Sequence, residues 1–457
     1  MGLVGFLSAA AFCQTENTTL QQPVPAMVGV NNSAEPAETY NPSNSDDRMM
    51  TPPPVSGQSY PVALASQERA NYLRGGLSFT SAYTDNALGG VSTNPVSDIS
   101  YSVAPFIELD ETTSRAHAEI NYAPGFTFYQ KTSSRNEADH NASIQFQYRL
   151  TPHVTFSVQD SFQKSSNVFN QPLDLTNGAV SGGAQNPNFS IIAPIADRLS
   201  NTGTVGLSYQ YGLNDMIGGS GTFSNLHYPN QAEVPGLGDS SSQGGLMFYT
   251  RRVARGQYLG ASYAYERLMS YPAVGVNETQ THAALLFYTF APTSSKFSIS
   301  FFGGPQYSDT IQPAGFGRIT SWTPAGGASL GWQGQLTSFA LSYIHIISSG
   351  GGLIGSVKQD SGTLSIRQQI TKTLNGTVGG GYSQNDVIGT TALGVNNGHS
   401  ISGTASLRQM IGQHVGVELG YSRVRQNYSN VQVISTFPDI NREFISISYL
   451  FSRPLGR

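Results

Sequence analysis

The sequence predicts an all-β fold, a transmembrane antiparallel up-and-down β-barrel of about 18 strands, with 16 left open, preceded by a disordered N-terminal tail. Three observations predict it. Apolar and polar residues alternate along segment after segment, the turns between segments are alternately short and long, and charged residues make up only 11% of the chain. Soluble domains are typically about 25% charged, so the polar face here is built from Ser, Thr, Asn and Gln.

The clearest alternation runs from Ala142 to Gln163, in two runs separated by a very short break. A period of two places alternate side chains on opposite faces of a strand, so this stretch predicts a β-hairpin with one apolar face. The apolar positions are Ile144, Phe146, Tyr148 and Leu150, then Val154, Phe156, Val158 and Phe162.

Similar segments recur to the end of the chain. We expect strands at 72–84, 98–109, 115–129, 138–150, 153–164, 199–211, 216–228, 240–253, 257–271, 280–291, 296–309, 321–335, 338–348, 357–370, 373–385, 399–411, 414–428 and 442–452. Every second connection is short, and an even strand number places both barrel ends on the short-turn side, which is the periplasm in a bacterial outer membrane. Pro105 and Pro324 fit poorly, because a proline inside a strand removes a ladder hydrogen bond.

Residues 1–13 are expected to be a signal peptide, because an apolar core is followed by small residues. It lacks the usual basic start, which fits a start codon placed too far downstream. The alternative is a lipoprotein signal with Cys13 acylated, but bulky Phe12 directly before the cysteine argues against it.

Three further divisions complete the predicted organisation. Residues 14–70 are rich in Pro, Asn and Ser without periodicity, so we expect a disordered periplasmic tail, with a small plug as the alternative. Residues 71–452 form the barrel and 453–457 a C-terminal tail.

Composition excludes several classes of function. A formal charge of −4 is too small to argue for nucleic acid or an anionic membrane surface as a partner. A single cysteine excludes a disulfide framework, and the eight histidines show no zinc-ligand spacing. Beyond the N-terminus no apolar run approaches the roughly 20 residues of a transmembrane helix. We therefore expect no metal and no cofactor.

The last strand carries the most specific signal. In the stretch from Arg442 to Arg457, Ile445, Ile447, Tyr449 and Phe451 alternate and end on an aromatic residue, although six residues follow it. This resembles the C-terminal signal by which the assembly machinery recognises outer-membrane barrels. The chain resembles bacterial outer-membrane β-barrels, similar to the putative β-barrel porins of Gram-negative and acidobacterial genomes.

The resemblance implies a bacterial outer-membrane protein that contacts lipid, with a homo-oligomer left open. A barrel of 16–18 strands is wide enough to hold water, so the expected function is passive diffusion of small hydrophilic solutes. The alternatives are a barrel for polysaccharide export and a non-conducting structural or adhesive barrel.

The candidate pore lining consists of charged residues at the strand positions that alternate with the apolar ones. A charge at an apolar, lipid-facing position would cost roughly 2–4 kcal/mol near the midplane of the bilayer. The alternative is that they form ion pairs that only hold the wall. They are Arg74, Glu108, Arg115, His117, Glu119, Arg149, Arg367, Arg408 and Glu418.

The longest loop, Ser165 to Ala196, is the candidate constriction, and Asp174, Asn177 and Asn186 are its candidate constriction residues. In general porins the third outward loop narrows the lumen, and this loop is also the third. Equally, it could lie over the mouth of the barrel.

An enzymatic function is not expected. The stretch from Gly327 to Gly331 matches G-x-S-x-G, but that motif belongs between a strand and a helix. His140 and His345 suggest a lipid hydrolase, for which no partner serine can be identified.

Overall fold

The computed structural model describes residues 71–87, 95–165, 197–234, 236–272, 275–291, 296–312, 317–388, 397–429 and 439–455. The predicted signal peptide and tail, residues 1–70, therefore lie outside the described residues.

Eighteen strands form a single sheet, which confirms the predicted fold and strand number. They are β1 (Tyr72–Thr84), β2 (Asp98–Thr112), β3 (Ala116–Tyr129), β4 (Glu137–Thr151), β5 (Val154–Ser165), β6 (Arg198–Gln210), β7 (Asp215–His227), β8 (Asp239–Ala254), β9 (Gln257–Tyr271), β10 (Asn277–Phe290), β11 (Phe297–Ile311), β12 (Arg318–Gln333), β13 (Thr337–Ser348), β14 (Val357–Gln369), β15 (Leu374–Val387), β16 (Gly398–Ile411), β17 (Val415–Tyr428) and β18 (Ile440–Pro454). Within the described residues, three short 3-10 segments lie between strands, namely η3 (Ser133–Arg135), η4 (Gln231–Glu233) and η5 (Gly350–Gly352).

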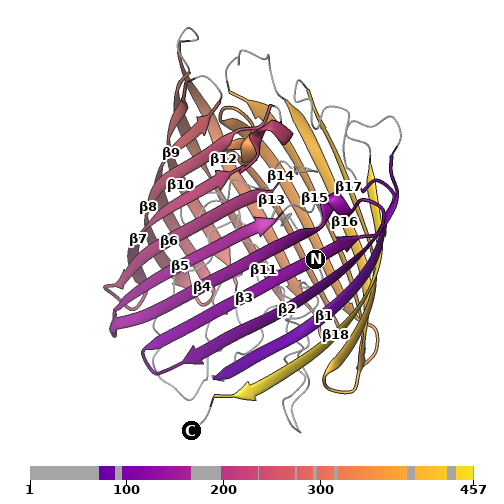
Figure 1. Ribbon diagram of the computed structural model, residues 1–457. Helices are drawn as coiled ribbons and strands as arrows, with labels where there is room; N and C mark the ends of the chain where they lie inside the picture. The colour runs from indigo at the N-terminus through magenta and orange to yellow at the C-terminus, as the bar shows by residue number, and fades with distance from the viewer. Residues whose placement is uncertain are drawn as a thin grey trace.

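The sheet closes on itself, because each strand pairs antiparallel with the next and β1 pairs with β18. This closing pair runs without interruption from Tyr72↔Pro454 to Thr84↔Arg442. Figure 1 shows the first and last strands side by side at the front of the barrel. Closure removes the free edges that an open sheet would expose.

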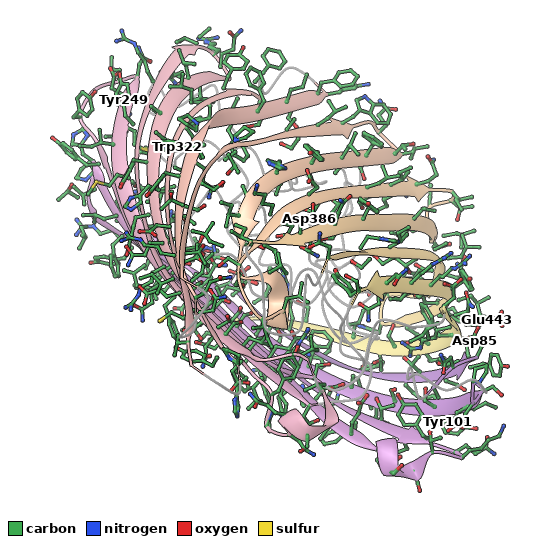
Figure 2. All side chains as sticks on the ribbon, turned by 90° about the horizontal axis from the view of Figure 1, so that it is seen from above. Asp85, Tyr101, Tyr249, Trp322, Asp386 and Glu443 are labelled. Carbon is green, nitrogen blue, oxygen red and sulfur yellow. The ribbon has the colours of Figure 1, made fainter. Side chains whose placement is uncertain are left out.

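The two faces of the wall separate as the alternation predicts. On β1, Leu77 and Phe79 are 49% and 47% exposed, whereas Ser78 and Thr80 between them are 1% and 2% exposed. In Figure 2, Tyr101 and Tyr249 lie on the outer surface of the barrel. A soluble protein rarely exposes apolar surface continuously around its whole circumference, so the outer face is that of a transmembrane barrel.

Aromatic rings on the inward face lie over glycines of a neighbouring strand. At each such glycine an added Cβ would collide with the facing ring. Glycine allows this close approach because it has no side chain. The pairs are Phe106 over Gly76, Phe248 over Gly218, Phe287 over Gly260, Phe302 over Gly327, Phe444 over Gly420 and Tyr428 over Gly398.

One seam of the barrel is only half paired. The strand β12 pairs with β11 from Ile311↔Arg318 to Phe297↔Trp332, but with β13 only from Gly326↔His345 to Gln333↔Ser338. In the described part of the chain, residues 318–325 of β12 therefore have no ladder partner on the β13 side. We call residues 318–325 of β12 and 346–348 of β13 the parted seam.

The end of β13 turns toward the interior at the parted seam. The backbone N–H of Ile347 donates to Oε1 of Gln306 on β11, two strands away, at 3.2 Å. The Ile347 side chain packs with Leu268 of β9. Pro324, one of the two prolines that fitted the strand prediction poorly, lies two residues before Gly326, where β12–β13 pairing begins, and has no N–H to donate.

Candidate functional site: the barrel interior

The inner wall is mainly polar and uncharged. Along each strand, the inner wall is formed by the residues that alternate with the outward-facing ones. Hydroxyl groups on neighbouring strands form hydrogen bonds with one another. Thr80 donates to Ser446 at 2.9 Å, and Ser102 and Thr127 lie 2.9 Å apart. Such pairs satisfy the buried hydroxyls within the wall.

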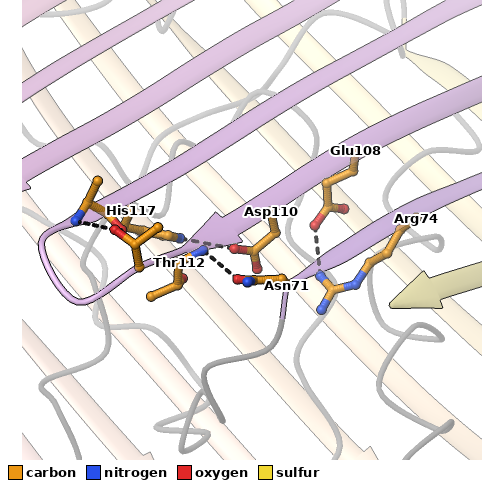
Figure 3. Close-up of polar contacts among 8 residues, drawn as sticks. Asn71, Arg74, Glu108, Asp110, Thr112 and His117 are labelled. Atoms are coloured by element: carbon orange, nitrogen blue, oxygen red, sulfur yellow. Dashed lines mark hydrogen bonds and ion pairs between the residues drawn. The ribbon is translucent and has the colours of Figure 1, made fainter. Parts of the chain in front are cut away.

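Predicted pore-lining charges gather on β1 to β3 near their short-turn ends. Nη1 of Arg74 donates to Oε1 of Glu108 at 2.7 Å, and Nε2 of His117 lies 3.2 Å from Oδ1 of Asp110 (Figure 3). Glu119 faces Asp110 in the β2–β3 register. Sequence reasoning did not single out Asp110, although it shares the polar parity of Glu108.

A second group of predicted charges lies on β14, β16 and β17. Arg408 faces Glu418 in the register, and its Nη2 donates to Oγ of Ser448 at 3.4 Å. Arg367 and Arg408 are each 8% exposed. Both groups are therefore held within the wall by neighbours.

The other two predicted charges differ in position. Arg149 lies on β4, opposite Thr155 of β5. Arg115 is exposed in the turn between β2 and β3, one residue before the strand begins, rather than in the strand we expected from 115 to 129. The predicted constriction residues Asp174, Asn177 and Asn186 lie outside the described residues.

Another loop crosses the interior. Residues 349–356 join β13 to β14, yet Leu353 forms an antiparallel bridge with Leu237 of the β7–β8 connection. The N–H of Gly238 donates to the carbonyl oxygen of Gly352 at 2.8 Å. The N–H of Gly355 donates to Oγ of Ser270 at the end of β9, at 3.0 Å. The loop therefore joins the β13–β14 hairpin to strands five places away around the wall.

The crossing loop is buried at every residue except Ile354, which is half-buried. Leu353 is 0% exposed, and Gly350 to Gly352 are buried. Gly352 has a φ of 105°, and a Cβ there would lie 2.7 Å from Oη of Tyr228. Only glycine fits both the backbone conformation and the space. Sequence reasoning missed this loop, although four glycines among eight residues are an unusual signal.

The predicted assembly residues lie on the outward face of β18. Ile445, Ile447, Tyr449 and Phe451 are 45–53% exposed. In the register they face Ser81, Phe79, Leu77 and Gly75 of β1. The strand that carries the predicted assembly signal is thus also the strand that closes the barrel.

The groups weighed for catalysis occupy different faces. Ser329 of the G-x-S-x-G match is buried on the inward parity of β12. His345 is half-buried on the outward parity of β13, where its Nδ1 lies 2.8 Å from Oδ1 of Asp360. Across the described ranges, no group of three or more His, Cys, Asp or Glu residues is arranged to hold a metal ion. The same ranges hold no helix long and apolar enough to cross a membrane.

No family model matches the sequence, and no curated protein matches it. Among solved structures, the outer membrane protein opdK from Pseudomonas aeruginosa matches with a TM-score of 0.42 and 11% identity, over 83% of this chain and 99% of that chain. OccAB4 of Acinetobacter baumannii matches with a TM-score of 0.41 and 9% identity, over 84% and 99%. The unliganded ferric citrate transporter FecA matches with a TM-score of 0.43 and 10% identity, over 86% of this chain and 64% of that chain. At these values the likeness identifies neither a family nor a ligand for this chain.

Proposed function

We propose that this chain is a channel of the bacterial outer membrane for passive diffusion of small hydrophilic solutes, and that the crossing loop, residues 349–356, controls its opening. The observation that carries the proposal is a closed barrel of 18 strands with an apolar outer face and a polar inner wall. A barrel of this strand number has an interior wider than its own side chains fill.

Under this proposal, lipid covers the outer face and the last strand is recognised by the barrel-assembly machinery. The charged groups around Glu108 and Arg408 then lie in the wall of the periplasmic half of the barrel, where their electric field acts on charged solutes. A polysaccharide exporter would share the barrel but would need a path wide enough for a chain of sugars, which a loop bonded across the interior obstructs.

The crossing loop can be locked by a disulfide. Leu237 and Leu353 face each other in an antiparallel bridge, which brings their Cα atoms within reach of a disulfide. The variant Leu237→Cys/Leu353→Cys is made in a Cys13→Ser background, with each single cysteine as a control. We expect oxidation to reduce single-channel conductance in planar bilayers and a reducing agent to restore it.

The outcomes separate the two parts of the proposal. Equal conductance of the oxidised and reduced double variant would show that the loop does not control opening. Silence of every variant, from protein shown to be folded by its resistance to SDS, would overturn diffusion and leave a structural or adhesive barrel.

A further inference from the structure

The parted seam opens on the lipid-facing surface of the barrel. A transmembrane strand needs about 9–11 residues. On β12, a stretch of this length that starts at Trp332, near the short-turn end, reaches Trp322 near the opposite end of the strand. Trp322 is 71% exposed on the outward face. Residues 322–325 of the seam therefore lie at the outer edge of the apolar layer.

At this depth, no described strand pairs with β12 on the β13 side. Every second residue of an edge strand directs its N–H and C=O toward the open side. Two backbone hydrogen bonds at the ends of β12 fix this direction. The carbonyl oxygen of Gly317 accepts from the N–H of Gln312 at the end of β11, and the N–H of Gly334 donates to the carbonyl oxygen of Thr337 at the start of β13. The even-numbered residues of β12, Thr320 and Trp322 among them, therefore direct their N–H groups toward the parted seam. Unsatisfied backbone groups are costly in lipid, so a donor here needs an acceptor from outside the sheet.

The side chains behind the seam are apolar, unlike most of the inner wall. Ala325, Ile346 and Phe302 are 3%, 8% and 4% exposed and belong to one buried cluster. Beside them, Oγ1 of Thr323 is buried and has no hydrogen-bond partner among the described residues. Apolar side chains and a polar atom without a partner thus meet at one gap in the wall.

We propose that the parted seam binds one membrane lipid. One acyl chain lies along the gap against Ala325 and Ile346, and the ester or phosphate oxygens of the headgroup accept hydrogen bonds from the N–H groups of Thr320 and Trp322. The seam is continuous with the lipid-covered outer face, so a lipid molecule on that face can enter it directly. The nearby Arg318 side chain is already paired with Asp309, so no charge on the lipid is required. The proposal goes beyond solute diffusion and rests only on the membrane placement of the barrel.

Tryptophan fluorescence tests the proposal. The chain has two tryptophans, Trp322 and Trp332, and both are replaced by Phe. Ile346→Trp then places a reporter behind the seam, and Leu246→Trp serves as the matched control. Leu246 is also buried and inward-facing, but its strand is paired on both sides, to Ser220 and Ala264. Each variant is reconstituted in phosphatidylcholine with plain or brominated acyl chains, since bromine quenches only an indole that it approaches.

We expect bromine to cause a loss of fluorescence for Ile346→Trp and none for Leu246→Trp. Equal fluorescence of Ile346→Trp in the two lipids would overturn the proposal and favour a strand of a second copy as the occupant. Equal loss in both variants would overturn the seam as the specific site. Thr323→Trp, also at the seam, replaces Ile346→Trp if that variant does not fold.

A protein that retains only Trp322 tests the membrane placement separately. Its exposed indole must be quenched by brominated lipid whether or not a lipid occupies the seam. An unquenched Trp322 would contradict the proposed outer-membrane function itself.

Discussion

The closing seam and the parted seam show how differently two strand pairs of one barrel can be built. The β1–β18 pair is continuous over all of β1, although its strands lie at opposite ends of the sequence. The β12–β13 pair joins neighbours in sequence but covers only the short-turn half of β12. Proximity along the chain therefore does not decide which seam is complete. A proline at the split and a loop bonded across the interior hold the second seam apart.

The largest expected effect comes from proline in the closing strand. Ile447 has a partner on both sides, Phe79 and Val417, so Ile447→Pro removes a donor from a ladder and leaves a backbone carbonyl without its hydrogen bond, which should cost several kcal/mol in lipid. We expect failure to form the SDS-resistant barrel. Thr320→Pro is the matched change in the parted seam, where the N–H has no strand to reach, and should leave the barrel intact. Equal loss of folding in both variants would contradict the contrast between the seams.

A smaller effect is expected from the ion pair beside the closing seam. Glu108 is 2% exposed and accepts a hydrogen bond from Arg74. Glu108→Ala leaves that guanidinium without its partner and should cost about 1–3 kcal/mol. We expect a lower temperature for loss of the SDS-resistant form, whereas Glu111→Ala, at an exposed position of the same strand, should change it little. An unchanged temperature for Glu108→Ala would mean that the pair adds nothing to closure.

The smallest expected effect concerns the outer end of the closing seam. The Asp85 carboxylate accepts hydrogen bonds from the backbone N–H and Nδ2 of Asn441, at 2.8 and 2.6 Å. Asp85→Ala should weaken this end by about 1 kcal/mol. Faster amide hydrogen exchange at Asn441 is the expected readout. Asp386→Ala is the control, since among the described residues its carboxylate accepts a single long contact of 3.5 Å, from Gln384. An unchanged exchange rate at Asn441 would show that the ladder alone holds this end.

The strand pattern was predictable from sequence because it is local. Alternation with a period of two places the strand from 72 to 84 at the bounds observed for β1, and the predicted number of 18 strands is confirmed. The inward or outward direction of a charge such as Glu108 follows from the same parity. Small differences arise at turns, where Arg115 precedes the strand that it was expected to begin.

The crossing loop and the parted seam were not predictable in the same way. The bridge between Leu237 and Leu353 joins residues more than a hundred positions apart, and no local periodicity records such a contact. Pro324 did appear as a conflict with the strand pattern. The conflict is resolved by the missing neighbour on one side of β12, which only the three-dimensional pairing reveals.

The inward rings that lie over glycines have a consequence for the history of the sequence. In each pair, such as Phe444 over Gly420, a side chain added at the glycine would occupy the place of the ring. Neither position can therefore change freely while the other stays the same. Among descendants of a common ancestor, we expect the aromatic residue and the facing glycine to be inherited together and lost together, so that each pair behaves as a single heritable character.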